Sequence, residues 1–141
     1  MKIKNRVISF TVGGSGGCCS HEDTEFRFLQ SGKKFILVGA ETTAWSATNL
    51  EYAYESRQSI NFRSEKVVYS MRTGNPRDNE RVIDRNQKNQ YTEVKLPFKS
   101  LITWEIANFQ ADNYFKSLER IPNLCGWIDG KKRKFVSCKD I

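Results

Sequence analysis

The sequence predicts an α+β domain, mainly an antiparallel β-sheet with one short helix and a C-terminal disulfide-linked β-hairpin. Three observations predict this class: apolar and polar residues alternate in several short segments, helical spacing occurs in one segment, and two cysteines flank the last turn. A chain of 141 residues is long enough for one domain with its own core. We expect a single domain with an antiparallel β core over residues 1–96, a helical segment over 97–121 and a hairpin over 122–141.

Short strands account for most of the expected β core. Apolar residues alternate with polar ones around 8–12 and again at 24–29, which is the period of a half-buried strand. The segment 35–40 is apolar on both faces, as is typical of a central strand, and forms an antiparallel hairpin with 24–29. A second hairpin is expected from 59–62 and 66–72, and a further strand is expected at 91–96.

Two stretches lack a clear period. Residues 41–58 are rich in Thr, Ala and Tyr, so we expect a long loop there, or an edge strand around 50–54. Residues 73–90 form a polar and charged run that contains glycine, proline and four asparagines. This composition predicts a mobile loop.

Helical spacing is confined to residues 98–121, and 111–120 is the expected helix. Pro122 lies just beyond its end, where a proline commonly stops a helix. Within the helix two basic residues are balanced by two acidic ones, whereas a helix that enters the major groove of DNA normally carries a cationic excess. The helix is therefore not predicted to recognise DNA.

Four cysteines at positions 18, 19, 125 and 138 allow three full pairings. The pattern of the segment between Cys125 and Cys138 predicts a hairpin with a turn at 129–134. Folding this segment about its midpoint places the two cysteines opposite each other. A bond between them contributes about 3 kcal/mol in the chain-entropy model. Cys18 and Cys19 are free or pair elsewhere, because a bond between adjacent residues needs a strained ring. Four reduced thiols in a cytosolic protein are the alternative.

The charge balance is basic, with 23 Lys and Arg against 16 Asp and Glu, a net charge of +7 and a pI near 9.3. The excess lies in 57–95 and in the tail 131–139. A basic surface attracts anionic partners such as nucleic acid, anionic lipid, cell-wall polymer or an acidic protein. A soluble basic protein without a dedicated anionic ligand is the plain alternative.

Cysteine usage and charge together favour an oxidising compartment, the periplasm or the outside of the cell. The charged start at 2–6 is similar to the first part of a signal peptide, but 7–12 is too short and too polar for the apolar part that should follow. If the protein is exported, we therefore expect that Met1 replaces a removed leader or a longer N-terminal segment. No apolar run approaches the roughly 20 residues of a membrane-spanning helix, so no transmembrane segment is predicted.

The candidate chemical motifs are weak. GGSGG at 13–17 resembles a phosphate-binding loop but lacks the Lys-Ser/Thr pair and the helix that should follow, so a flexible connection is expected. Cys18, Cys19 and His21 are three potential metal ligands, but adjacent cysteines fit tetrahedral zinc poorly and lie too close to His21 in sequence for a nucleophile–base pair. We expect no catalytic residues, no metal and no cofactor.

Candidate binding residues are one tryptophan and several cations. Trp45 lies in a stretch without a period, where a core role is not evident, and exposed aromatic residues are common binding anchors. The arginines at 72–85 have tyrosines only at their flanks, whereas proteins that bind single strands interleave cations with stacking aromatics. Each group has an alternative interpretation. The arginines at 72–85 can lie in a solvated loop, the cations at 131–134 can form a solubilising hairpin tip, and Trp45 can be buried in the core. The candidate partner-binding residues are Trp45, Arg72, Arg77, Arg81, Arg85, Lys131, Lys132 and Arg133.

Three segments carry a resemblance to a group of proteins: FRFLQSGKKFILVGAE at 26–41, SINFRSEKVVYSM at 59–71, and the cysteine-bounded end at 125–138. In these segments, which cover about half of the chain, the sequence resembles small bacterial exported proteins of unknown function, many of them lipoproteins or periplasmic proteins. The resemblance implies an antiparallel β domain outside the cytoplasm. It implies no catalytic residue.

These observations predict a non-catalytic binding protein of the periplasm or the secreted fraction that meets a protein or cell-envelope partner. An immunity protein or an enzyme inhibitor is a concrete version of this hypothesis. A basic nucleic-acid-binding protein of the cytoplasm is the alternative, supported by charge alone. An enzyme ranks third, because the sequence places no base, nucleophile and orienting group together.

Overall fold

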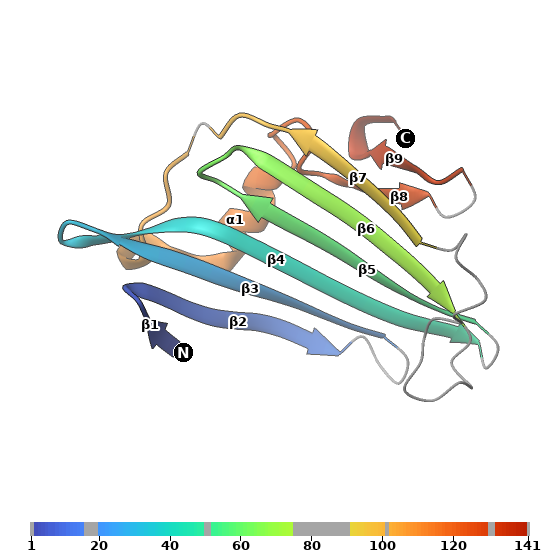
Figure 1. The fold of residues 1–141 in the computed structure, drawn as a ribbon, viewed down its shortest axis with the longest axis horizontal. Coiled ribbons are helices and arrows are strands. Elements are labelled where there is room, and N and C mark those ends of the chain that lie inside the picture. Colours follow the sequence, from blue (N-terminus) through green and yellow to red (C-terminus); the bar gives the residue numbers. More distant parts are fainter. Residues whose placement is uncertain are drawn as a thin grey trace.

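In the computed structural model, residues 2–15, 20–49, 52–74, 91–100, 102–129 and 132–140 are described. Within this part of the chain, seven strands form one antiparallel sheet in which each strand pairs with its neighbours in sequence (Figure 1). The order is therefore that of a simple meander, β1 to β7. The strands are β1 (Lys2–Lys4), β2 (Val7–Ser15), β3 (Ser20–Ser31), β4 (Lys34–Asn49), β5 (Tyr52–Asn61), β6 (Lys66–Gly74) and β7 (Tyr91–Pro97).

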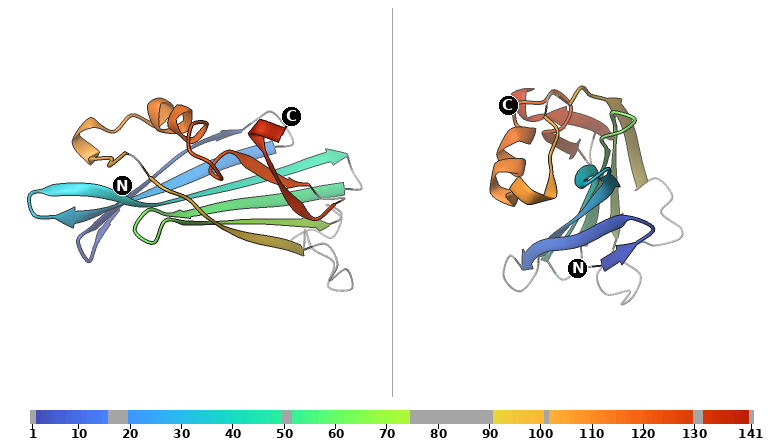
Figure 2. Two further views of the ribbon diagram at one scale, coloured as in Figure 1. Left: turned by 90° about the horizontal axis from the view of Figure 1, so that it is seen from above. Right: turned by 90° about the vertical axis from the view of Figure 1, so that its left-hand side faces the viewer.

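The elements after the sheet lie on one of its faces. Figure 2 shows helix α1 (Ala111–Leu118) and the hairpin of β8 (Gly126–Asp129) and β9 (Lys134–Ser137) on the same side of the meander. We call this side the covered face and the opposite side the open face. Two short 3₁₀ helices, at Ile106–Asn108 and Cys138–Asp140, complete the structure in the described residues.

Aromatic side chains form the centre of the covered face. Phe26 and Phe28 point inward from β3 and are fully buried, while Glu25 beside them is exposed. The Phe26 ring lies 5.0 Å from the ring of Tyr114 on α1 and 4.8 Å from that of Phe109. Edge-to-face contacts of this kind are favourable beyond the area that they bury. The helix is thus held to the sheet by aromatic packing.

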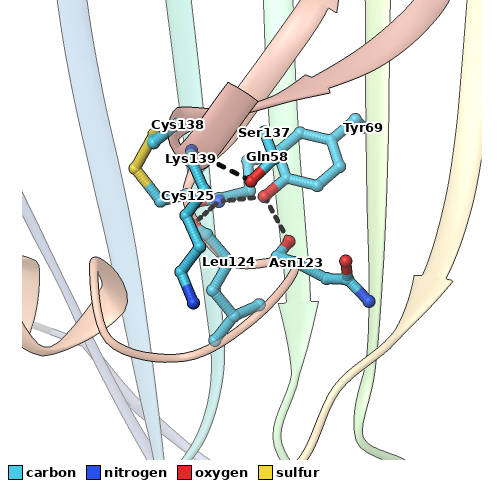
Figure 3. Close-up of a disulfide and its surroundings, with 8 residues drawn as sticks. All are labelled: Gln58, Tyr69, Asn123, Leu124, Cys125, Ser137, Cys138 and Lys139. Carbon is cyan, nitrogen blue, oxygen red and sulfur yellow. Dashed lines mark hydrogen bonds between the residues drawn. A yellow bond between two sulfur atoms is a disulfide. The ribbon is translucent and has the colours of Figure 1, made fainter. Parts of the chain in front are cut away.

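A disulfide closes the C-terminal hairpin, and a small polar network ties its start to the sheet (Figure 3). Cys125 and Cys138 form the disulfide, and the Cys138 amide donates to the Cys125 carbonyl at 3.1 Å. The Gln58 amide donates to the Tyr69 hydroxyl and to the Leu124 carbonyl, both at 3.0 Å. These contacts hold the start of the hairpin against β5 and β6.

The main features of the predicted class are confirmed. The described chain is mostly antiparallel sheet with one α-helix and a Cys125–Cys138 disulfide. Gly126 pairs with Ser137, which is the register obtained by folding the segment about its midpoint, although residues 130 and 131 of the turn lie outside the described part. The segment 35–40 lies in β4, the middle strand of the meander.

The expectation of a long loop or a short edge strand at 41–58 was wrong. β4 continues to Asn49 and β5 begins at Tyr52, so two long central strands occupy this stretch. On the covered face the paired residues here are Thr42 with Gln58 and Ala44 with Ser56. Because these side chains are small or polar, the residues of the covered face do not alternate with the others as apolar against polar, and the sequence shows no strand pattern.

Three further boundaries differ from expectation. The helix ends at Leu118 and is followed by a turn, and the helical spacing earlier in 98–121 corresponds to no α-helix in the residues described there. Residues 2–4, where no strand was expected, form strand β1 against β2. In the expected loop at 73–90, residues 73 and 74 extend β6, and 75–90 lie outside the described residues.

Candidate binding surface

Five side chains form a continuous row across the open face. Trp45 of β4 lies opposite His21 of β3 and Glu55 of β5. Glu55 in turn lies opposite Arg72 of β6, which lies opposite Tyr91 of β7. Directly opposed residues in an antiparallel sheet share a face and have Cβ atoms about 5 Å apart. The meander therefore assembles one row, the Trp45 row, from five separate strands.

The aromatic members of the row are exposed. Trp45 is 45% exposed and Tyr91 is 39% exposed, although both lie on regular strands. The Arg72 guanidinium lies 4.9 Å from the centre of the Tyr91 ring, a cation–π contact. Trp, Tyr and Arg are the residue types most enriched at the energetic centres of protein interfaces.

The neighbouring charges are paired rather than free. The Arg57 guanidinium lies 3.2 Å from a Glu41 carboxylate oxygen and 3.8 Å from one of Glu55. The His21 ring and the Asp23 carboxylate are 2.6 Å apart. Exposed ion pairs of this kind add little to the free energy of folding. Their contribution here is to hold the polar side chains around Trp45 in defined positions.

Tyr91 is fixed from two sides. Its hydroxyl donates to a Glu93 carboxylate oxygen at 2.6 Å, and this hydrogen bond is the main cause that raises the pKa of Tyr91. Its carbonyl accepts a 2.8 Å hydrogen bond from the Arg133 guanidinium, which also contacts the Thr92 hydroxyl at 3.3 Å. The tip of the C-terminal hairpin is thus joined to β7 at the end of the row.

The structure brings together only part of the residue set that the sequence suggested. Trp45 and Arg72 lie in one row, and Trp45 lies on β4 and not in a loop. Arg133 is bonded to the sheet, while Lys132 is exposed and its amide donates to the Asp129 carboxylate at 3.2 Å. The remaining candidates, Arg77, Arg81, Arg85 and Lys131, lie outside the described residues.

Sequence reasoning missed His21, Glu55, Arg57 and Tyr91 as members of this surface. The available signal was alternation, because Glu41, Thr43 and Trp45 occupy every second position of β4 and share the open face. That signal predicts a strand but not which residue lies opposite which. The row exists only once the register of four strand pairs is known.

Metal-binding and membrane-spanning features are absent from the described residues. No group of three or more His, Cys, Asp or Glu side chains there is placed to hold a metal ion. Cys18 and Cys19 lie outside the described part, as do Gly16 and Gly17 of the glycine-rich segment. No helix in the described ranges has the length and apolar character needed to cross a membrane.

Comparisons with models of known protein families, with curated proteins and with solved structures found no match. The chain is therefore characterised by its own geometry. Fold and surface define a small α+β protein in which a meander sheet is packed on one face and presents a row of aromatic and charged side chains on the other.

Proposed function

We propose that this chain is a non-catalytic binding protein that docks a folded protein partner on the open face of its sheet. The single observation that supports the proposal is the Trp45 row. It presents a half-exposed tryptophan between ion-paired side chains on regular strands, with Arg72 and Tyr91 at its end. A side chain held in place before binding loses less conformational freedom when a partner arrives.

The charge pattern favours a protein over a nucleic acid as partner. Around Trp45 the cations are matched by acids, since Arg57 pairs with Glu41 and Glu55, and Arg72 lies opposite Glu55. A surface for a polyanion needs a stripe of uncompensated cations. Mixed signs around an aromatic centre are typical of protein interfaces, where charges fix the register of docking.

The disulfide supports an oxidising location for this function. Disulfides persist in the periplasm and outside the cell and are rare in the reducing cytosol. Cys125–Cys138 joins the two ends of the hairpin, and the tip of that hairpin contacts the end of the Trp45 row. An immunity protein or an enzyme inhibitor of the periplasm or secreted fraction fits this combination.

The test compares two tryptophans of equal exposure. Trp45 and Trp127 are each 45% exposed, but Trp127 lies on β8 of the C-terminal hairpin and is not a member of the Trp45 row. The oxidised protein is immobilised, and a partner is captured from an extract of periplasmic and secreted proteins. The affinity of this partner is then measured for the wild-type protein, for Trp45→Ala and for Trp127→Ala. We expect Trp45→Ala to weaken binding by about 30-fold, which is the typical effect of truncating a residue that dominates the binding energy of an interface. Trp127→Ala should leave the affinity unchanged. A captured partner that binds both variants equally would overturn the proposal.

A further inference from the structure

A second feature of the open face lies at the other end of the strands. A pocket of about 270 Å³ opens where β3, β4 and β5 meet, next to the bulge at which Val38 is the extra residue of β4. It is lined by Val7, Arg27, Val38, Gly39, Ser59, Ile60, Asn61 and Arg63. Two arginines, a serine and an asparagine therefore line one small concavity. No carboxylate lines it.

Neither arginine of the pocket has an ion-pair partner among the described residues. Arg27 is partly buried, and Glu25, two positions before it on the same face, does not approach it within 4 Å. Glu41, the corresponding acid on β4, is paired with Arg57 instead. Two unpaired guanidinium groups in one concavity repel each other, and an anion between them removes that repulsion.

Both arginines are positioned by the backbone around them. Gly39 lies opposite Arg27, and a Cβ atom added to Gly39 would lie 2.9 Å from the Arg27 Nη2 atom. The guanidinium therefore occupies space that only glycine leaves free. Arg63 belongs to the β5–β6 turn, in which the Asn61 side-chain oxygen accepts hydrogen bonds of 3.0 Å from the amides of Arg63 and Ser64.

The surroundings add positive charge. Lys4 of β1 pairs in register with Val7, and Lys66 of β6 pairs with Asn61, so each lies one strand away from a lining residue on the same face. Glu65, the acid of the turn, uses its carboxylate to accept a hydrogen bond from the Ser100 amide at 3.0 Å. Four cations thus lie in or next to the pocket, and two of the nearby acids, Glu41 and Glu65, are engaged in other contacts.

We infer that this pocket binds a phosphate group. Guanidinium groups bind the oxygens of a tetrahedral phosphate through paired N–H donors, and two of them from different elements enclose it better than one. Ser59 and Asn61, which carry neutral polar side chains, line the same site. Gly39 and Trp45 are six residues apart on β4, roughly 20 Å along a strand, so this site is separate from the Trp45 row.

Phosphate is available either as the free ion or as the headgroup of an anionic lipid, and two binding experiments distinguish these sources. Calorimetric titration with inorganic phosphate tests the free ion. Flotation with phosphatidylcholine vesicles, with and without phosphatidic acid, tests the headgroup. The variants are Arg27→Gln, Arg63→Gln and Gly39→Ala. The matched control is Arg120→Gln, which removes the same charge from an exposed arginine after α1.

We expect saturable binding in at least one of the two experiments, lowered about tenfold by Arg27→Gln and by Arg63→Gln, and unchanged by Arg120→Gln. Gly39→Ala displaces the Arg27 side chain without removing its charge, so it should weaken binding while the thermal midpoint stays close to that of the wild type. No saturable binding in either experiment, or an equal loss in Arg120→Gln, overturns the inference. None of these results depends on the protein partner of the Trp45 row.

Discussion

The hydroxyl of Tyr69 donates a 2.7 Å hydrogen bond to the carbonyl of Asn123, which joins the middle of β6 to the segment that precedes the disulfide. The same hydroxyl accepts from Gln58 at 3.0 Å (Figure 3). The side chain is buried, and burial raises the pKa of Tyr69 to about 12 because the phenolate is poorly solvated there. This one residue therefore links the pH dependence of stability to the docking of the C-terminal hairpin.

Stability should fall above pH 10 through Tyr69. Its pKa is about 12 in the folded chain and 10.0 when unfolded, so the unfolded state binds fewer protons between these values and the free energy of unfolding decreases as pH rises. The contribution is fully present below pH 10. At about pH 11 roughly 1.4 kcal/mol of it is lost.

Urea unfolding at pH 9 and pH 11 checks this, with Tyr69→Phe as the comparison. The variant should be less stable at pH 9, because its hydrogen bonds are missing, but should lose less stability on going to pH 11. Lysines and other tyrosines titrate in both proteins, so they cancel in the difference. Equal losses in the two proteins would show that Tyr69 does not contribute to the pH dependence.

Replacing both Cys125 and Cys138 with Ala should lower the thermal midpoint by several degrees. The disulfide closes a separation of 13 residues and contributes about 3 kcal/mol in the chain-entropy model, which is large for a chain of this size. The measurement is thermal unfolding under oxidising conditions. Reductant should lower the midpoint of the wild type but leave that of the double variant nearly unchanged. An unaltered midpoint in the double variant would contradict a structural role for the bond.

Phe26→Ala should be far more destabilising than Trp45→Ala. Phe26 has no exposed surface and contacts the rings of Phe109 and Tyr114, so its removal leaves a cavity that costs about 3 to 5 kcal/mol. Trp45 is 45% exposed on the open face, and its loss removes little packing. Denaturant unfolding of both variants measures the difference. Similar losses would mean that Trp45 stabilises the fold and is not a free binding platform.

Affinity for DNA should be weak and steeply dependent on salt. Arg57 and Arg133 are engaged within the protein, and Arg72 lies over Tyr91, which leaves few free cations beside the Trp45 row among the residues that the structure describes. Affinity for DNA then comes from non-specific contacts with phosphates, which release counterions and therefore weaken as salt rises. Titration of labelled single- and double-stranded DNA at physiological salt measures it. Tight binding that discriminates between sequences would favour the nucleic-acid alternative.

The local sequence was sufficient to predict the strands that bury large side chains on one face. Phe26 and Phe28 alternate with Glu25 and Arg27, and this alternation by itself indicates a strand with one apolar face. The disulfide was predictable for a similar reason, because the apolar residues and the turn of the last segment determine where its ends meet. In both cases the information lies within about a dozen neighbouring residues.

Tertiary structure alone decided the open face. Trp45, Arg72 and Tyr91 come from three strands, and their alignment in one row depends on pairings that no local pattern contains. Arg27 and Arg63 likewise meet at one pocket only because a bulge and a turn bring β3, β4 and β5 together. Composition determined the basic charge of the protein, and local alternation determined its β strands. The register of the meander determined which of the described charged side chains lie close enough to pair. Register is set by burial of the opposite face, so the positions of the surface residues follow from the packing of the core.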